Sequence, residues 1–108
     1  MGRIMSRGLG KIQRAILAVL GTRDGYKWLD GGTPVTELTV RVYHPERFDH
    51  GECDSWDYTR SEYVATHRAV DALERRGLVT TWEYDRDMRL HRRTRGGRTR
   101  MRAVRLKR

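Results

Sequence analysis

Six arginines crowd the stretch RRTRGGRTRMR, which runs from residue 92 to residue 102 and contains no acidic residue. They are Arg92, Arg93, Arg95, Arg98, Arg100 and Arg102. A guanidinium group can form paired hydrogen bonds to a phosphate, and arginine also suits the negative potential of a narrow DNA minor groove. The stretch therefore predicts binding to a nucleic-acid backbone. A solvated charged tail and a dynamic hairpin that binds any polyanion are the alternative interpretations.

The charge of the whole chain is concentrated at the same end. The 108 residues carry a net charge of +9. Residues 86–108 contain ten Arg, one Lys and one Asp, a net charge of +10, so the preceding 85 residues are close to neutral at −1. Such asymmetry indicates a polyanionic partner, most often nucleic acid.

Residues that could bind a metal ion gather between residues 44 and 58. His44, His50 and Cys53 lie there, and the acidic residues beside them are Asp49, Glu52 and Asp54. Structural zinc sites take four ligands at short, recurrent spacings, and this segment matches no such spacing. We therefore expect no metal site, and we interpret the segment as an acidic loop.

No group of residues predicts catalysis. The segment 8–11, GLGK, lacks both the spacing and the preceding strand of a phosphate-binding loop. Asp49, His50, Asp54 and Asp57 could be arranged as a nuclease site, but no pattern in the sequence orders them. We expect neither an enzyme nor a cofactor. With one cysteine, no long apolar run and no signal-peptide pattern, the chain is expected to be cytoplasmic and without a membrane partner.

Three amphipathic segments are expected to form helices. Over residues 8–21, apolar residues recur at helical spacing and Gly21 is the expected C-terminal stop. Over residues 33–44, Thr33-Pro34 is a favourable helix start, although the alternation at residues 39–43 also fits a strand. Over residues 59–77, Thr59 and Glu62 have the spacing of a capping box, and Gly77 ends the helix.

Strand-favouring residues then predict a β-hairpin over residues 78–106. The segment LVTTWEY forms its first strand, and Met101, Ala103 and residues 104–106 form its return strand. Gly96-Gly97 is a typical turn pair, which places the arginine stretch at the hairpin tip. The predicted fold is a single α+β domain over residues 1–108, with a three-helix bundle and a C-terminal wing of two or three strands.

This order of elements, together with the sequence RAVDALERRGLV at residues 68–79, resembles the winged helix-turn-helix regulators of the MarR-like and related bacterial or phage types. In that family a leucine–glutamate–basic–basic–glycine–leucine–valine sequence ends the recognition helix and leads into the wing. The resemblance covers roughly residues 8–106. It implies sequence-specific binding of double-stranded DNA, with the third helix in the major groove and the wing on the backbone or minor groove.

Transferred by position, the outward residues of the third helix are Arg60, Ser61, Val64, Ala65, His67 and Arg68. Arginines can bind phosphate or guanine, Ser61 and His67 can hydrogen-bond base edges, and Val64 can contact a thymine methyl group. If the wing neutralises about five or six phosphates, binding should follow a log–log salt slope of about −5. The alternative is that these residues form an ordinary solvated helix face.

Two other partner classes are compatible with the sequence. A winged-helix protein-interaction module, such as a phage-type inhibitor of a host factor, would use exposed aromatic anchors such as Trp28 or Trp56. A structured-RNA binder would place the arginine hairpin on an A-form groove. A homodimer is also possible, and the sequence identifies no effector ligand.

Overall fold

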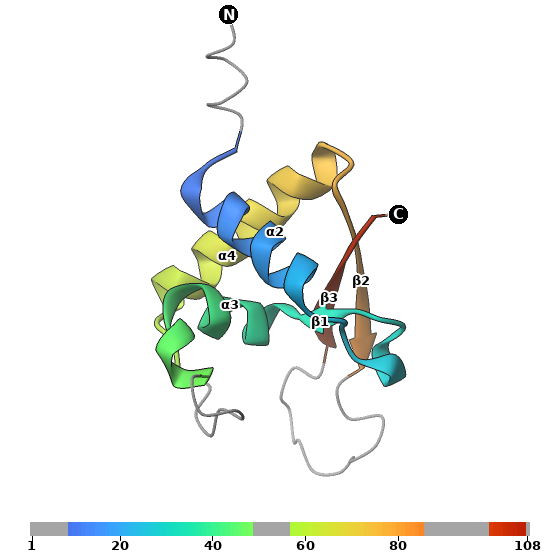
Figure 1. Cartoon of the computed structure of the whole chain (residues 1–108), viewed down its shortest axis with the longest axis horizontal. Coiled ribbons are helices and arrows are strands. Elements are labelled where there is room, and N and C mark those ends of the chain that lie inside the picture. Colours follow the sequence, from blue (N-terminus) through green and yellow to red (C-terminus); the bar gives the residue numbers. More distant parts are fainter. Residues whose placement is uncertain (1–8, 49–56, 86–99, 108) are drawn as a thin grey trace, which may run out of the picture.

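The computed structural model describes residues 9–48, 57–85 and 100–107, which form an α+β domain (Figure 1). Its elements in chain order are α2 (Lys11–Thr22), the 3-10 turn η1 (Lys27–Leu29), β1 (Thr33–Pro34), α3 (Val35–Tyr43), the 3-10 turn η2 (Pro45–Phe48), α4 (Arg60–Arg75), β2 (Val79–Asp85) and β3 (Arg100–Leu106). In the described part of the chain, no helix combines the length and the apolar character needed to cross a bilayer.

The first helix, α2, begins and ends later than the sequence pattern predicts. Gly10 is its N-cap, and the helix runs through Gly21 to Thr22 before Arg23 turns extended. The expected stop at Gly21 is wrong because this glycine keeps a helical backbone, and it does not have a positive φ. The predicted inward face is confirmed at Ile16 and Leu20, which are buried.

The segment predicted as a helix over residues 33–44 starts with a strand. Thr33 and Pro34 form β1 and pair with Val104 and Ala103 of β3, so α3 covers only Val35–Tyr43. Pro34 is the N-cap, with an extended backbone (φ −63°, ψ 142°), rather than a residue of the first helical turn. The short strand β1 is the third strand of the sheet, and the sequence predicted a wing of two or three strands.

The longest helix, α4, agrees with the sequence pattern to within two residues at each end. The Thr59 hydroxyl accepts a hydrogen bond from the Glu62 amide at 3.1 Å, and Glu62 Oε1 accepts one from the Thr59 amide at 2.9 Å. The predicted capping box is therefore confirmed. Gly77 follows the helix with φ +78°, a conformation that glycine adopts without strain.

The three strands form an antiparallel sheet in the order β1-β3-β2. Asp85 lies opposite Arg100 and Tyr84 opposite Met101. A two-residue turn at Gly96-Gly97, continued as an unbroken ladder, would instead pair residue 85 with residue 108. The observed register of β2 and β3 therefore differs from the one that this turn would give. The predicted turn itself lies outside the described residues.

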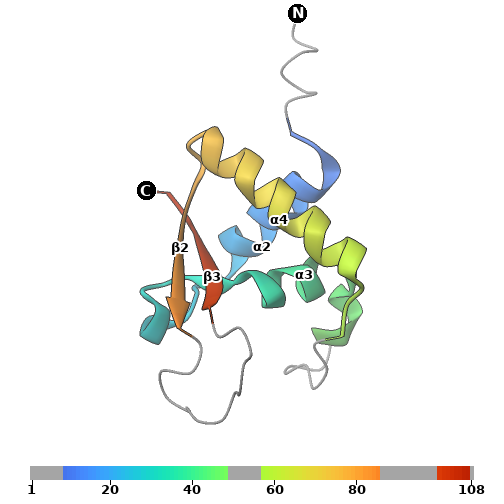
Figure 2. The ribbon, with the colours of Figure 1, turned by 180° about the vertical axis from the view of Figure 1, so that it is seen from behind.

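One hydrophobic core joins the helices to the sheet. Buried residues from α2, α3 and α4 meet residues of β2 and β3, and Ile16, Leu38, Val70, Leu73 and Val104 are fully buried among them. Seen from behind, β2 runs back from the C-terminal end of α4 towards the level of its N-terminal end (Figure 2). The core therefore fixes the position of α4 against the β2–β3 pair.

Loss of the capping box should measurably destabilise the domain. Replacing Thr59 with alanine removes the hydroxyl that accepts from Glu62, and such N-cap changes cost about 1 kcal/mol of unfolding free energy. Urea denaturation of the wild type and of Thr59→Ala measures this difference. Thr59→Ser keeps the hydroxyl and should retain most of the stability; an equal loss in both variants would contradict the capping role.

Candidate nucleic-acid interface

The outward face of α4 exposes most of the residues that the sequence assigned to DNA contact. Arg60, Ser61 and Arg68 are exposed, and Val64 keeps 36% of its surface accessible. Ala65 is half-buried beside them. The first nine residues of the helix thus present two cations, a hydroxyl and small apolar groups on its outward face. These are the group types that read phosphates and base edges.

His67 lies differently from its neighbours on this face. It is half-buried, and its ring meets Tyr63 edge-on at 4.5 Å between centroids. Its Nδ1 lies 3.3 Å from Nη1 of Arg102, which can donate to a neutral imidazole. Burial, and secondarily the charge of Arg102, lower the pKa of His67, while Asp71 opposes this change. His67 therefore links α4 to β3 in addition to bordering the exposed face.

Arg102 joins β3 to the flank of α4 through ion pairs. Its guanidinium lies 2.9 Å from Asp71 and 3.2 Å from Glu74, and it also contacts the Thr81 hydroxyl at 3.4 Å. The side chain is only 19% exposed. These contacts pair the two carboxylates on this side of α4 with a cation, which reduces their repulsion towards a phosphate. They also hold the β2–β3 pair beside the helix.

Arg100 is the other arginine of the stretch that lies within the described residues. Arg100 pairs with Glu83 at 2.9 Å, and both side chains are about two-thirds exposed. Exposed pairs of this kind contribute little stability, so a phosphate can compete for Arg100. The other predicted contacts lie outside the described residues: Arg92, Arg93, Arg95 and Arg98.

The segment considered for zinc is only partly described. His44 Nε2 lies 3.1 Å from Oε1 of Glu62 and so supports the start of α4. The hydrogen bond from the Thr59 amide, and secondarily the contact with His44, lower the pKa of Glu62. Within the described ranges no three potential ligands come together. The remaining candidates, Asp49, His50, Glu52, Cys53 and Asp54, lie outside them.

A buried carboxylate that the sequence analysis missed ties the first connector to α3. Glu37 is 2% exposed, and it accepts hydrogen bonds from Arg41 at 2.8 Å, Arg23 at 3.3 Å and the Tyr26 hydroxyl at 2.6 Å. Burial, and secondarily the contact with Glu37, raise the pKa of Tyr26. A glutamate in the first turn of an amphipathic helix gives no sign of burial, so the sequence carried no signal for this cluster.

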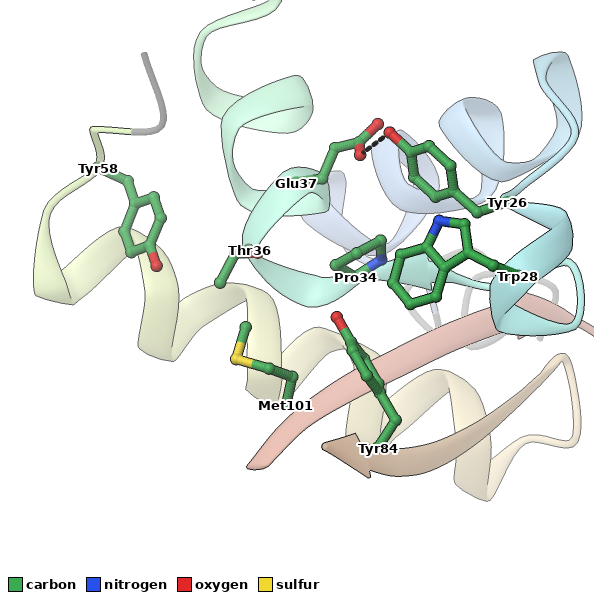
Figure 3. Close-up of a pocket in the computed structure, with 8 residues that line it drawn as sticks. All are labelled: Tyr26, Trp28, Pro34, Thr36, Glu37, Tyr58, Tyr84 and Met101. Carbon is green, nitrogen blue, oxygen red and sulfur yellow. Dashed lines mark hydrogen bonds between the residues drawn. The ribbon is translucent and has the colours of Figure 1, made fainter. Parts of the chain in front are cut away.

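Glu37 also lines a cavity of about 550 Å³, and half of the lining residues are aromatic (Figure 3). The residues that line it are Tyr26, Trp28, Pro34, Thr36, Glu37, Tyr58, Tyr84 and Met101. Trp28 stands between Tyr26 and Tyr84, with ring centroids 5.9 and 5.8 Å away. Trp28 was predicted from the sequence as an exposed anchor, and it is exposed. The cavity lining as a whole comes from five separate segments that only the fold brings together.

Comparison of the chain with protein-family models, curated proteins and solved structures gave no match.

Acidification should destabilise the fold through His67. Its pKa is lowered in the folded state, so between that value and the unfolded value of about 6.5 the unfolded chain binds more protons. The stability that depends on neutral His67 is complete above about pH 6.5 and is lost as the pH falls below it.

Urea denaturation between pH 5 and pH 8 tests this pH dependence. As the pH falls, the free energy of unfolding of the His67→Gln variant should decrease less steeply than that of the wild type, because the variant lacks the titrating imidazole. The carboxylates titrate alike in both chains and therefore do not contribute to the difference. Superimposable pH profiles would contradict the role assigned to His67.

Proposed function

We propose that this chain is a winged-helix protein that binds double-stranded DNA sequence-specifically, as a transcriptional regulator of bacterial or phage type. The order helix, strand, helix, helix, strand, strand, with β3 between β1 and β2, supports the winged-helix assignment. The sequence RAVDALERRGLV at the end of α4 supports it independently. In such proteins the third helix enters the major groove and the hairpin contacts the flanking backbone.

The observation that carries the proposal is that an exposed face of α4, with two arginines, lies beside the two strands that the arginine-rich segment connects. Arg60 and Arg68 are exposed on α4, and the segment 86–99, which holds most of the arginine stretch, connects the two strands beside it. Arg102 pairs with Asp71 and Glu74 and thereby fixes these strands against the helix. A duplex lying along α4 would then run near the ends of these strands, from which the arginine-rich segment departs.

In this proposal α4 and the hairpin arginines would have different roles in DNA recognition. Val64 and Ala65 offer few hydrogen-bonding groups, so direct base contacts would come mainly from Arg60, Ser61 and Arg68. Such contacts supply specificity, whereas phosphate contacts supply most of the affinity and its salt dependence. The hairpin arginines would therefore set how tightly the protein binds, and α4 would set where.

Fluorescence anisotropy at several salt concentrations tests the proposal. The probes are a duplex from the region upstream of the protein's own gene, a scrambled duplex and an RNA duplex. A preference of about 10³-fold or more for the first probe is expected of a specific regulator. Equal, steeply salt-dependent binding to all three probes would overturn sequence-specific recognition and reduce the surface to a general polyanion site.

A further inference from the structure

The aromatic cavity contains a tryptophan ring that is exposed to solvent, beside tyrosines that are half-buried. Trp28 is 58% exposed, the largest value among the exposed large hydrophobic side chains of the described residues. Its ring meets Tyr84 edge-on at 5.8 Å. Figure 3 shows Tyr58 and Met101 across the cavity from Trp28, with Thr36 and Pro34 between the two sides. An exposed tryptophan costs hydrophobic free energy, so a partner that covers it would gain affinity.

The polar groups of the cavity favour an uncharged ligand. The carboxylate of Glu37 already accepts from Arg23, Arg41 and Tyr26, so it has no need of a cationic ligand. The other lining side chains are Trp28, three tyrosines with their hydroxyls, a methionine, a proline and Thr36, and none of them carries a charge. A flat heteroaromatic ring, which stacks on aromatic faces and hydrogen-bonds at its edge, matches this chemistry.

The cavity adjoins both surfaces assigned to DNA. Tyr58 lies two residues before α4 begins at Arg60, and Tyr84 and Met101 face each other near the ends of β2 and β3 from which the segment 86–99 departs. A nucleic-acid strand that runs from the start of α4 towards the paired ends of β2 and β3 would therefore pass close to residues that line the cavity. Aromatic faces beside a cationic surface are the usual means of binding unpaired bases.

We propose that this cavity binds an unpaired nucleobase, so that the protein prefers DNA in which a duplex continues into a single strand. The preference for a duplex junction rests on the proposed DNA-binding function, whereas the stacking of a base in the cavity does not. A base stacked on an aromatic side chain raises affinity by about 5-fold to 150-fold. Trp28 supplies the exposed ring, Tyr84 meets it edge-on, and Tyr58 lines the opposite side of the cavity.

The test compares a blunt duplex with the same duplex carrying a short thymidine tail at either its 5′ or its 3′ end. Wild type should bind one tailed duplex at least about 5-fold more tightly than the blunt one. Trp28→Ala should abolish this gain and leave the blunt-duplex affinity unchanged. Trp28→Phe keeps a ring and should retain part of the gain, which separates stacking from a general change in structure.

Leu78→Ala is the matched control. Leu78 is also an exposed apolar residue, at 37%, but it precedes β2 at the end remote from Tyr84. It should leave both affinities unchanged. Circular dichroism checks that each variant is folded. Equal binding of tailed and blunt duplexes by wild type, or a gain that survives in Trp28→Ala, would overturn the proposal.

Two further probes separate this proposal from the proposed function. If wild type binds no blunt duplex but binds an oligothymidine strand in a Trp28-dependent way, the duplex function fails and base stacking stands. If it binds neither, both fail. If thymidine monophosphate alone perturbs the Trp28 indole resonance while no tail improves binding, the cavity serves a free nucleotide and the proposed recognition of a bound strand is overturned.

Discussion

Glu37→Gln should lower the free energy of unfolding by about 2–3 kcal/mol, below the 3–5 kcal/mol typical of a broken buried ion pair. The expected loss is smaller because water partly screens the arginines. Arg23 and Arg41 keep about a quarter of their side-chain surface in water, while Glu37 keeps 3%. Glutamine preserves the shape and an acceptor for Tyr26, but it leaves two guanidinium groups without a counter-charge. Chemical denaturation at neutral pH measures the loss.

The control is Glu46→Gln, which removes a carboxylate that is 66% exposed and lies 3.8 Å from His44. Pairs of this kind contribute about 0–1 kcal/mol, so this variant should resemble wild type. A second readout is the pKa of Tyr26, which burial and Glu37 raise in wild type and which should fall in Glu37→Gln. Stability within 0.5 kcal/mol of wild type would contradict the role assigned to Glu37.

Local patterns in the sequence predicted the elements whose determinants are also local. The capping box of Thr59 and Glu62, the apolar spacing of α4 and the glycine at residue 77 all act within a few residues. Each therefore leaves a readable pattern. The inward faces of α2 and α4 were predicted for the same reason, because a buried stripe at helical spacing needs no knowledge of its partner.

Features that depend on distant partners left no such pattern. Thr33-Pro34 resembles a helix start, yet these residues pair with β3 about 70 residues later, and that pairing decides their structure. Arg102 was grouped with the phosphate contacts because its neighbours are arginines. Its register in β3 also brings it to Asp71 and Glu74 on α4, and no pattern in the sequence predicted these ion pairs. The residues around Glu37 are likewise assembled only by the fold.

Replacing Arg92, Arg93, Arg95 and Arg98 with glutamine should reduce the affinity for duplex DNA by about 10³-fold at 0.15 M salt. Each phosphate contact adds about 0.9 to the magnitude of the log–log salt slope, so the slope should change from about −5 to between about −1 and −2. Arg102→Gln alone should change the slope by less than about 0.9, because its guanidinium is occupied by Asp71 and Glu74. Anisotropy titrations over a range of salt concentrations measure both quantities.

A second quadruple variant separates local contacts from overall charge. Replacing Lys11, Arg75, Arg76 and Lys107 with glutamine removes the same number of charges from exposed positions outside the arginine stretch. A general polyanion surface would respond to either set alike, since long-range attraction follows net charge. Hairpin arginines in direct contact with phosphates would make the first variant lose far more affinity and salt dependence than the second. Equal losses of affinity in the two variants would therefore contradict the assignment of the hairpin as the main phosphate-binding surface. Any sequence preference that survives in both variants would then be attributed to α4.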